Sequence, residues 1–301
     1  MKKELLLKGY GLVVLSALLF GCMPVITRQI YAQGINRECV VLLRNLLALP
    51  VLMLLTSREK KTYRLPRQAI PAIIGIALMG CCVTPILLYG SYQHIATGTA
   101  TVFHFIYPVV VVVIGWLFLG RRIKPTTLVA VLLCIIGICL FYNPGDPLDW
   151  KGCSLALASG ITYAIYVVLL SVFRYKQITG FRLNLYISIV CTIVMLSVCL
   201  VGKQLTLPDT LTGWLLCILL AVIINVGAVA MFQKGTFLIG GEHAAILSTV
   251  EPLTGVIMGI VVFQETVTYL AVIGCICILG ACILVAIGDT KSIVLLRKRK
   301  Q

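Results

Sequence analysis

Long runs of apolar residues alternate with short polar connections along the whole chain. Each run has about the 20 residues that an α-helix needs to cross a hydrocarbon core of about 30 Å. The connections are too short to form a separate soluble domain. The pattern predicts ten transmembrane helices, over residues 9–30, 38–56, 68–92, 97–119, 124–142, 150–172, 181–202, 211–233, 243–264 and 269–288.

The composition agrees with this pattern. Of the 301 residues, 60% are hydrophobic and 12% are charged, whereas a soluble domain carries about 25% charged residues. Most of the 13 cysteines lie inside apolar runs, where a thiol acts as a small hydrophobic group. The sequence therefore predicts an all-α integral membrane protein that needs no metal and no cofactor.

The basic residues are distributed unevenly between the two sets of connections. Twenty Lys and Arg residues lie in the N-terminal segment, in the connections after the even-numbered runs and in the C-terminal tail, whereas the alternate connections hold only four, Arg28, Arg37, Lys151 and Lys203. Positive charge stays on the cytoplasmic side, so we expect a multi-pass protein of the bacterial inner (plasma) membrane with both termini cytoplasmic. The net charge of +15 then reports topology and contact with anionic lipid rather than nucleic-acid binding.

The second half of the chain repeats features of the first half. At an offset of 144 residues the matched pairs are Ala100 and Ala244, Pro108 and Pro252, Gly115 and Gly259, and Leu140 and Leu284, and at 143 residues Ser16 matches Ser159. These pairs predict two five-helix repeats, over residues 9–142 and 150–288. Because five is odd, the second repeat is inverted relative to the first, as in carriers that rock two bundles around a central site.

Three segments carry a family resemblance. LLFGCMPVITRQI (Leu18–Ile30), LLRNLLALP (Leu42–Pro50) and the stretch Gly241–Leu284, which holds Glu-Pro and then Glu265, are similar to the signatures of EamA-type members of the drug/metabolite transporter superfamily. The resemblance covers nearly the whole chain. It implies a ten-helix secondary transporter that exports amino acids or related metabolites, or drugs. Tyr107 before the first-half proline and Arg121 at the position of Glu265 depart from the second-half pattern.

Glu251 and Pro252 form the first candidate for a transport site. Glu251 lies eight residues into the ninth run, or about 12 Å deep at 1.5 Å per residue, where a carboxylate costs about 2.5–3.5 kcal/mol on insertion scales. Pro252 interrupts the backbone hydrogen bonding next to it. Glu251 either lines the substrate path, binding a proton or an amine, or is a structural carboxylate bonded to its neighbours.

Arg44 is the second candidate, about six residues from the outer end of its run. Its side chain could extend to the membrane surface, form a structural ion pair, or hold a substrate carboxylate or phosphate with two hydrogen bonds. His104, followed by Tyr107 and Pro108, lies in the helix that the repeat pairs with that of Glu251. It is either a proton-sensitive or substrate-contacting group or a histidine bonded only to a neighbour.

Three further polar side chains lie inside apolar runs. Tyr163 and Asn225 are central in theirs, and Tyr89 lies in the third run. Such groups suit the orientation of a small solute, although aromatic residues near helix ends also anchor proteins at the membrane interface.

The pattern favours a carrier over two other classes of membrane protein. An embedded enzyme needs a nucleophile with a base, a metal cluster or a phosphate loop, and the sequence has no HExxH or GxxxxGK motif. A channel needs a continuous polar pore, whereas intramembrane polar groups are sparse here. We therefore expect an alternating-access carrier for a small molecule, either a metabolite exporter or a multidrug efflux carrier. Both a monomer and a homodimer are compatible with the pattern.

Overall fold

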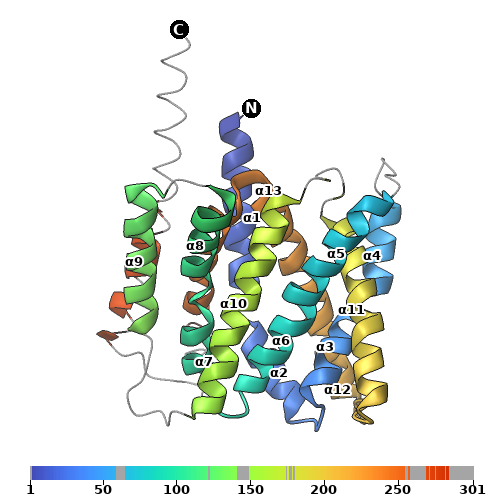
Figure 1. Cartoon of the computed structure of the whole chain (residues 1–301). Helices are drawn as coiled ribbons and strands as arrows, with labels where there is room; N and C mark the ends of the chain where they lie inside the picture. The colour runs from blue at the N-terminus through green and yellow to red at the C-terminus, as the bar shows by residue number, and fades with distance from the viewer. Residues whose placement is uncertain are drawn as a thin grey trace.

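The computed structural model describes residues 2–58, 65–95, 97–120, 123–140, 149–173, 175, 178, 180–254 and 257, together with parts of 269–284. All regular elements in these residues are helices, which confirms the all-α prediction (Figure 1). Those of the first half are α1 (Lys2–Phe20), α2 (Met23–Tyr31), α3 (Arg37–Leu46), α4 (Ala48–Ser57), η1 (Arg67–Ala69), α5 (Ile70–Ala77), η2 (Leu78–Val83), α6 (Thr84–Ser91), α7 (Thr97–His104), α8 (Tyr107–Leu119) and α9 (Pro125–Cys139). Those of the second half are α10 (Trp150–Val172), α11 (Phe181–Val201), α12 (Leu211–Leu220), η3 (Ala221–Val229), α13 (Ala230–Ile239), α14 (Gly241–Leu247) and η4 (Ser248–Val250).

Six continuous helical segments are long and apolar enough to cross a membrane: Glu4–Tyr31, Arg37–Ser57, Arg67–Ser91, Trp150–Val172, Phe181–Val201 and Leu211–Ile239. They coincide with six of the ten predicted runs. The runs 97–119 and 124–142 contain the shorter helices α7, α8 and α9. The run 243–264 is described to Thr254 and at Ile257, and much of 269–288 lies outside the described residues.

Several runs that we expected to be single helices are interrupted, and proline explains most of the interruptions. Proline lacks the N–H that would bond the carbonyl four residues earlier. The residues four before Pro24, Pro50 and Pro108 are the last residues of α1, α3 and α7. Pro85 is the second residue after the π-helix η2, and Pro252 is the second residue after the 3-10 turn η4. The π-helix η3 contains no proline.

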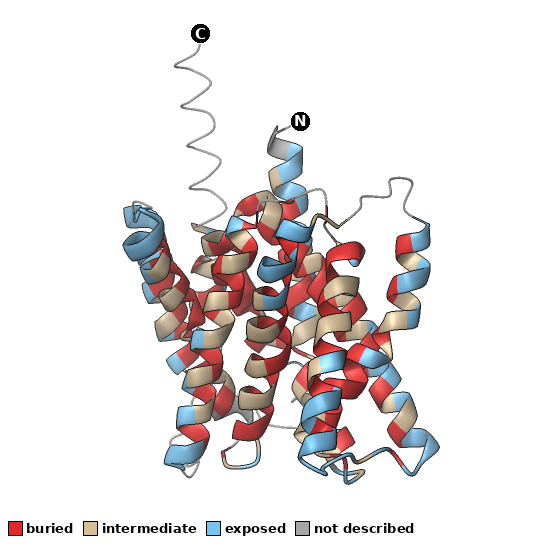
Figure 2. Ribbon diagram, turned by 45° about the vertical axis from the view of Figure 1, so that its right-hand side comes forward, coloured by how far each residue is buried: buried red, intermediate tan, exposed pale blue. Residues whose placement is uncertain are grey.

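The two halves of the chain are packed into each other rather than side by side. Helix α1 packs against α13, α10 against α6, and α11 against α3, so each of these contacts joins one half to the other. Buried residues lie where the helices face one another, and exposed residues lie on the outer faces and at the helix ends (Figure 2). The hydrophobic core therefore runs between the halves, which is where a site shared by both would lie.

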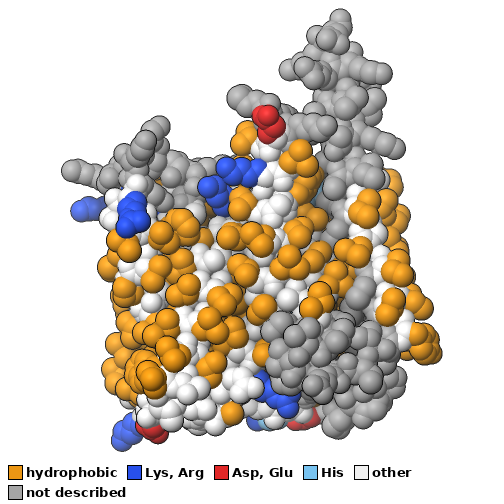
Figure 3. Space-filling view, turned by 180° about the vertical axis from the view of Figure 1, so that it is seen from behind, with side chains coloured by type: hydrophobic (Ala, Val, Ile, Leu, Met, Phe, Trp, Pro, Cys, Tyr) orange, Lys and Arg blue, Asp and Glu red, His pale blue; other side chains and the backbone are white. Residues whose placement is uncertain are grey.

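The outer surface suits a lipid environment. Large apolar side chains such as Trp116, Phe118 and Leu215 are more than half exposed, and in Figure 3 apolar side chains cover the middle of one face while Lys and Arg lie at its upper and lower margins. Helices satisfy their own backbone hydrogen bonds, which is the condition for crossing hydrocarbon. The chain is a multi-pass membrane protein.

Candidate functional site

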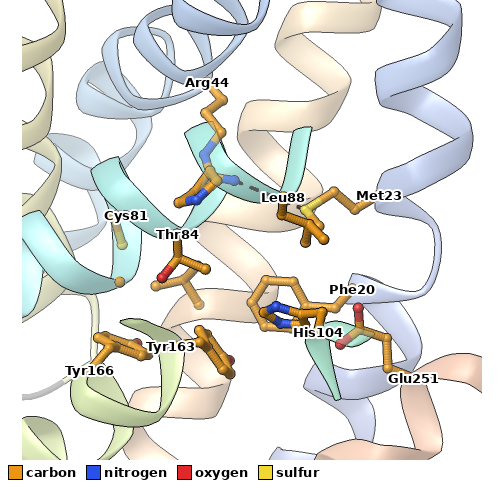
Figure 4. A pocket seen from close by; sticks show the side chains of 13 residues that line it. Phe20, Met23, Arg44, Cys81, Thr84, Leu88, His104, Tyr163, Tyr166 and Glu251 are labelled. Carbon is orange, nitrogen blue, oxygen red and sulfur yellow. Dashed lines mark hydrogen bonds between the residues drawn. The ribbon is translucent and has the colours of Figure 1, made fainter. Parts of the chain in front are cut away.

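A cavity lies in the core between the two halves. Its lining comes from the α1–α2 junction, α3, η2, α6 and α7 of the first half and from α10, η3 and the segment after η4 in the second. The lining residues are Phe20, Met23, Arg44, Gly80, Cys81, Thr84, Pro85, Leu88, His104, Tyr163, Tyr166, Val229 and Glu251. In Figure 4, Arg44 enters from one side, and Tyr163, Tyr166, His104 and Glu251 lie toward the opposite side. The cavity is thus a shared product of both halves.

The cavity is small in this conformation. Its volume is about 50 Å³, and one water molecule needs about 10–15 Å³ of cavity volume. The space therefore suits a few water molecules. A solute of amino-acid size requires the walls to move apart.

Arg44 is buried, with only 3% of its surface exposed. Its Nη1 donates to the hydroxyl of Tyr89 at 2.9 Å and lies 4.0 Å from the sulfur of Met23, whereas its Nε has no partner. None of the carboxylates in the described part of the chain lies within ion-pair distance of the guanidinium. Arg44 therefore does not extend to the membrane surface, and it brings a positive charge with an unused N–H to the cavity.

Glu251 brings the opposite charge to the same cavity. It directly follows the 3-10 turn η4, which ends the helix α14, and it is half-buried. Within the described residues its carboxylate forms no hydrogen bond and no ion pair. A carboxylate and a guanidinium that both face one cavity without contacting each other leave room for a solute that carries complementary charges.

His104 is oriented by the second half. Its Nδ1 lies 2.8 Å from the hydroxyl of Ser159 on α10, and this hydroxyl lies 2.6 Å from the carbonyl of Ala156. Because a hydroxyl has one proton, and here donates it to Ala156, its oxygen accepts from the Nδ1–H of His104. In neutral His104 the Nε2 atom is therefore a hydrogen-bond acceptor, which can receive a proton or bind a donor.

Aromatic side chains form a continuous wall on one side of the cavity. Tyr163 lies 5.4 Å from His104, 4.8 Å from Tyr107 and 5.3 Å from Tyr166 between ring centroids. Phe232 stacks on Tyr166 at 6.0 Å from behind. Such contacts fix the rings in place, so the wall presents a rigid, largely apolar surface to the solute.

The nine residues that the sequence predicted divide into two groups. Four line the cavity, and these are Arg44, His104, Tyr163 and Glu251. The other five lie outside the lining, although Tyr89 bonds Arg44, Tyr107 packs against His104 at 5.5 Å, and Pro108 and Pro252 lie at the two helix interruptions.

Asn225 lies in a separate buried network. Its Nδ2 donates to the side-chain oxygen of Asn45 at 2.8 Å, and its backbone carbonyl accepts from the side chain of Asn184. The network joins the π-helix η3 to α3 and α11. These contacts are those of a polar clamp between helices.

The segment from Gly80 to Leu88 supplies five lining residues that the sequence analysis did not select. In the sequence, the only signal in this segment is Pro85. A proline frees backbone groups, and the π-helical turn that precedes it in the structure is a feature that often marks a functional site. Phe20 and Met23 carried a similar signal in Pro24. Among the residues that the structure describes, no cluster of His, Cys, Asp or Glu has the geometry to hold a metal ion.

Comparison with known proteins identifies relatives that span the chain. An "Uncharacterized transporter" of Archaeoglobus fulgidus is 28% identical over 280 residues, covering 88% of this chain and 92% of the relative. An "Uncharacterized inner membrane transporter YicL" of Salmonella typhimurium is 24% identical, covering 94% and 97%. The "Pseudopaline exporter CntI" of Pseudomonas aeruginosa is 23% identical, covering 96% and 99%. All three are named as transporters.

A solved crystal structure has the same fold. It superposes with a TM-score of 0.73 over 95% of this chain and 99% of the other, at 16% sequence identity. The sequence model of the EamA-like transporter family matches residues 7–143 and again residues 150–287. The chain belongs to the EamA-like transporter family and is a membrane transporter rather than an enzyme.

Proposed function

We propose that this transporter exports small metabolites that carry both a negative and a positive group, such as amino acids, across the bacterial inner membrane by alternating access. The single observation that carries the proposal is the cavity between the halves, where Arg44 and Glu251 bring opposite charges without pairing. Arg44 suits a carboxylate, and Glu251 suits an ammonium group or a proton. His104 and the tyrosine wall would orient the rest of the solute.

The proposal includes a carrier of ten helices in two inverted repeats, 9–142 and 150–288. Support comes from the two matches of one family model and from local structure. The π-helices η2 and η3 begin 143 residues apart, at Leu78 and Ala221, and the turns after α7 and α14 begin 143 residues apart, at Phe105 and Ser248. Irregular backbone at matched depths is typical of inverted-repeat carriers.

The proposed orientation has both termini in the cytoplasm, and export is the proposed direction. The excess of Lys and Arg in the N-terminal segment, in the connections after the even-numbered runs and in the C-terminal tail supports the orientation. The relative named as an exporter supports the direction. The small cavity suits an occluded state between openings to the two sides.

Counterflow in proteoliposomes tests the proposal. Proteoliposomes that contain the purified protein are loaded with unlabelled amino acids and related zwitterions, and the uptake of each labelled solute is measured. The wild type is compared with Glu251→Gln and with a control, Glu4→Gln, in the exposed first turn of α1. We expect uptake by the wild type and the control and none by Glu251→Gln. Unchanged uptake by Glu251→Gln at every pH would remove Glu251 from the mechanism.

A multidrug carrier is the second candidate. The rings of Tyr163 and Tyr166 beside a carboxylate also suit an aromatic organic cation. Ethidium and tetraphenylphosphonium belong in the same panel. Transport of these cations, with loss in Glu251→Gln and retention in Arg44→Gln, would favour the second candidate, because a cation makes no use of the guanidinium.

A further inference from the structure

Cys39 and Cys199 form a buried thiol pair between the two halves of the chain. Cys39 lies in the first turn of α3 and Cys199 in the last turn of α11. Their sulfur atoms are 3.8 Å apart, and both residues have 0% of their surface exposed. A disulfide needs the two sulfurs at about 2 Å, so a side-chain adjustment of about 2 Å would join them.

The surroundings hold the two sulfurs in this position. The backbone N–H of Thr206 lies 3.1 Å from the sulfur of Cys39, and the carbonyl of Gln204 lies 3.3 Å from it. Asn36 caps α3 by accepting from the N–H of Cys39 at 2.8 Å, and its own N–H donates to the hydroxyl of Thr206 at 3.1 Å. The chain that follows α11 is thereby tied to the start of α3, which keeps the thiols opposed.

The repeat places a different contact at the other end of the same helix pair. Adding 143 to 39 gives Arg182, and subtracting 143 from 199 gives Thr56. These two residues meet as well, because Nη2 of Arg182 lies 3.5 Å from the carbonyl of Thr56. Helix α11 therefore contacts α3 at one end and α4 at the other end, and only the contact with α3 is made by two thiols.

The end with the thiols is the one that the proposed orientation places outside the cytoplasm, since α1 begins at the opposite end (Figure 1). Disulfides persist in oxidising compartments such as the periplasm and are rare in the cytosol. We propose that Cys39 and Cys199 are a disulfide site that covalently joins the two halves of the transporter at its outer end. The inference rests on the proposed orientation and goes beyond the proposed transport.

The chemistry is thiol–disulfide exchange with an extracytoplasmic protein disulfide as oxidant. One thiolate attacks one sulfur of the oxidant's disulfide and forms a mixed disulfide, while the oxidant's other sulfur leaves as a thiolate. The second cysteine thiolate then attacks the protein sulfur of the mixed disulfide and displaces the oxidant sulfur bound to it. The two cysteines lose two protons and two electrons and gain one S–S bond, while the oxidant becomes a dithiol. Because both sulfurs are buried, exchange takes place while the connection after α11 is open, during insertion or by local opening.

A non-reducing gel after cleavage between the halves tests the site. A protease site is inserted at residue 144, between the two halves. Free thiols are blocked in cells with acid and N-ethylmaleimide. The purified protein is then cleaved by the protease and separated on SDS gels without and with reductant. We expect the halves to remain joined without reductant and to separate with it. Cys39→Ser and Cys199→Ser should each separate without reductant. Cys191→Ser should stay joined, because Cys191 contacts Cys81 and Cys82 elsewhere in the core.

A matched pair at the other end serves as the control for compartment. In the Cys39→Ser, Cys199→Ser background, Thr56→Cys with Arg182→Cys should stay separable in cells and should become joined when isolated membranes are treated with diamide. Separation of the wild-type halves without reductant would overturn the proposal. If the halves of the wild type separate and those of the control variant stay joined in cells, the orientation is reversed. Failure of the transport assay alone would not affect the disulfide result.

Discussion

The two halves of the transporter contribute unlike surfaces to one cavity. The first half supplies the guanidinium of Arg44 and the imidazole of His104, and the second supplies the carboxylate of Glu251 and the rings of Tyr163 and Tyr166. At the offsets of the repeat, the counterpart of Arg44 is Ile187, and that of Glu251 is Tyr107. The duplicated scaffold supplies matched helix interruptions, whereas chemical selectivity comes from positions at which the halves have diverged.

The largest expected effect comes from removing the first half's charge. Arg44→Leu, which makes position 44 as apolar as its counterpart Ile187, should reduce counterflow of zwitterions by about 30-fold or more, because losing a buried charged partner costs about 2–5 kcal/mol. Arg37→Gln is the matched control, since Arg37 pairs with Glu38 outside the cavity. Equal transport by Arg44→Leu and the wild type would show that the charge difference between the halves has no role in selectivity.

The next effect concerns a position where the halves differ in volume. Gly80 in η2 faces the ring of Tyr166 so closely that an added methyl group would overlap it, while the second half has Ile223 at the matched position. Gly80→Ala should destabilise the protein by about 1–3 kcal/mol, which thermal unfolding in detergent would measure. Gly75→Ala in the preceding helix meets only a side-chain atom at 3.6 Å and should leave the melting temperature nearly unchanged. A similar shift for both variants would contradict the packing argument.

Tyr89→Phe sharpens the comparison by leaving the charge of Arg44 in place and removing its hydrogen bond. The bond to the guanidinium at 2.9 Å is worth about 1.5 kcal/mol or more, so the apparent affinity for a carboxylate-bearing solute should fall about tenfold. Tyr31→Phe is the control, because the hydroxyl of Tyr31 bonds only the carbonyl of Tyr89, at 3.3 Å. An unchanged affinity in Tyr89→Phe would mean that packing alone holds the guanidinium of Arg44 in position.

The smallest expected effect separates two matched serines. Ser159 bonds His104 beside the cavity, whereas its counterpart Ser16 bonds the carbonyl of Ala228 at 2.7 Å. Ser16→Ala removes one hydrogen bond of about 1 kcal/mol, and Ser159→Ala removes the bond to His104 together with the bond to Ala156. We expect Ser159→Ala to shift the pH profile of transport by releasing the His104 ring, and Ser16→Ala to leave that profile unchanged. Identical pH profiles for the two variants would argue against a role for His104 in proton handling.

The sequence was sufficient for the helices and for part of the site. The apolar runs predicted six membrane segments, and four of the polar residues selected within the runs, Arg44, His104, Tyr163 and Glu251, line the cavity. The direction of a polar side chain could not be predicted in the same way. Arg44 points inward because Tyr89 and Met23 receive its guanidinium, and Asn225 points away from the cavity because Asn45 lies within 2.8 Å. Such choices depend on neighbours that are distant in sequence.

The π-helix η2 has a consequence for the register of the chain. A π-helical turn behaves as one residue inserted into an α-helix, and one residue corresponds to about 100° of rotation at 3.6 residues per turn. If Leu78–Val83 formed a regular α-helix with all its residues retained, α6 would be rotated by about that angle relative to α5. Thr84 and Leu88 would leave the cavity and Tyr89 would leave Arg44. The π-helical turn therefore determines which face of α6 lines the cavity.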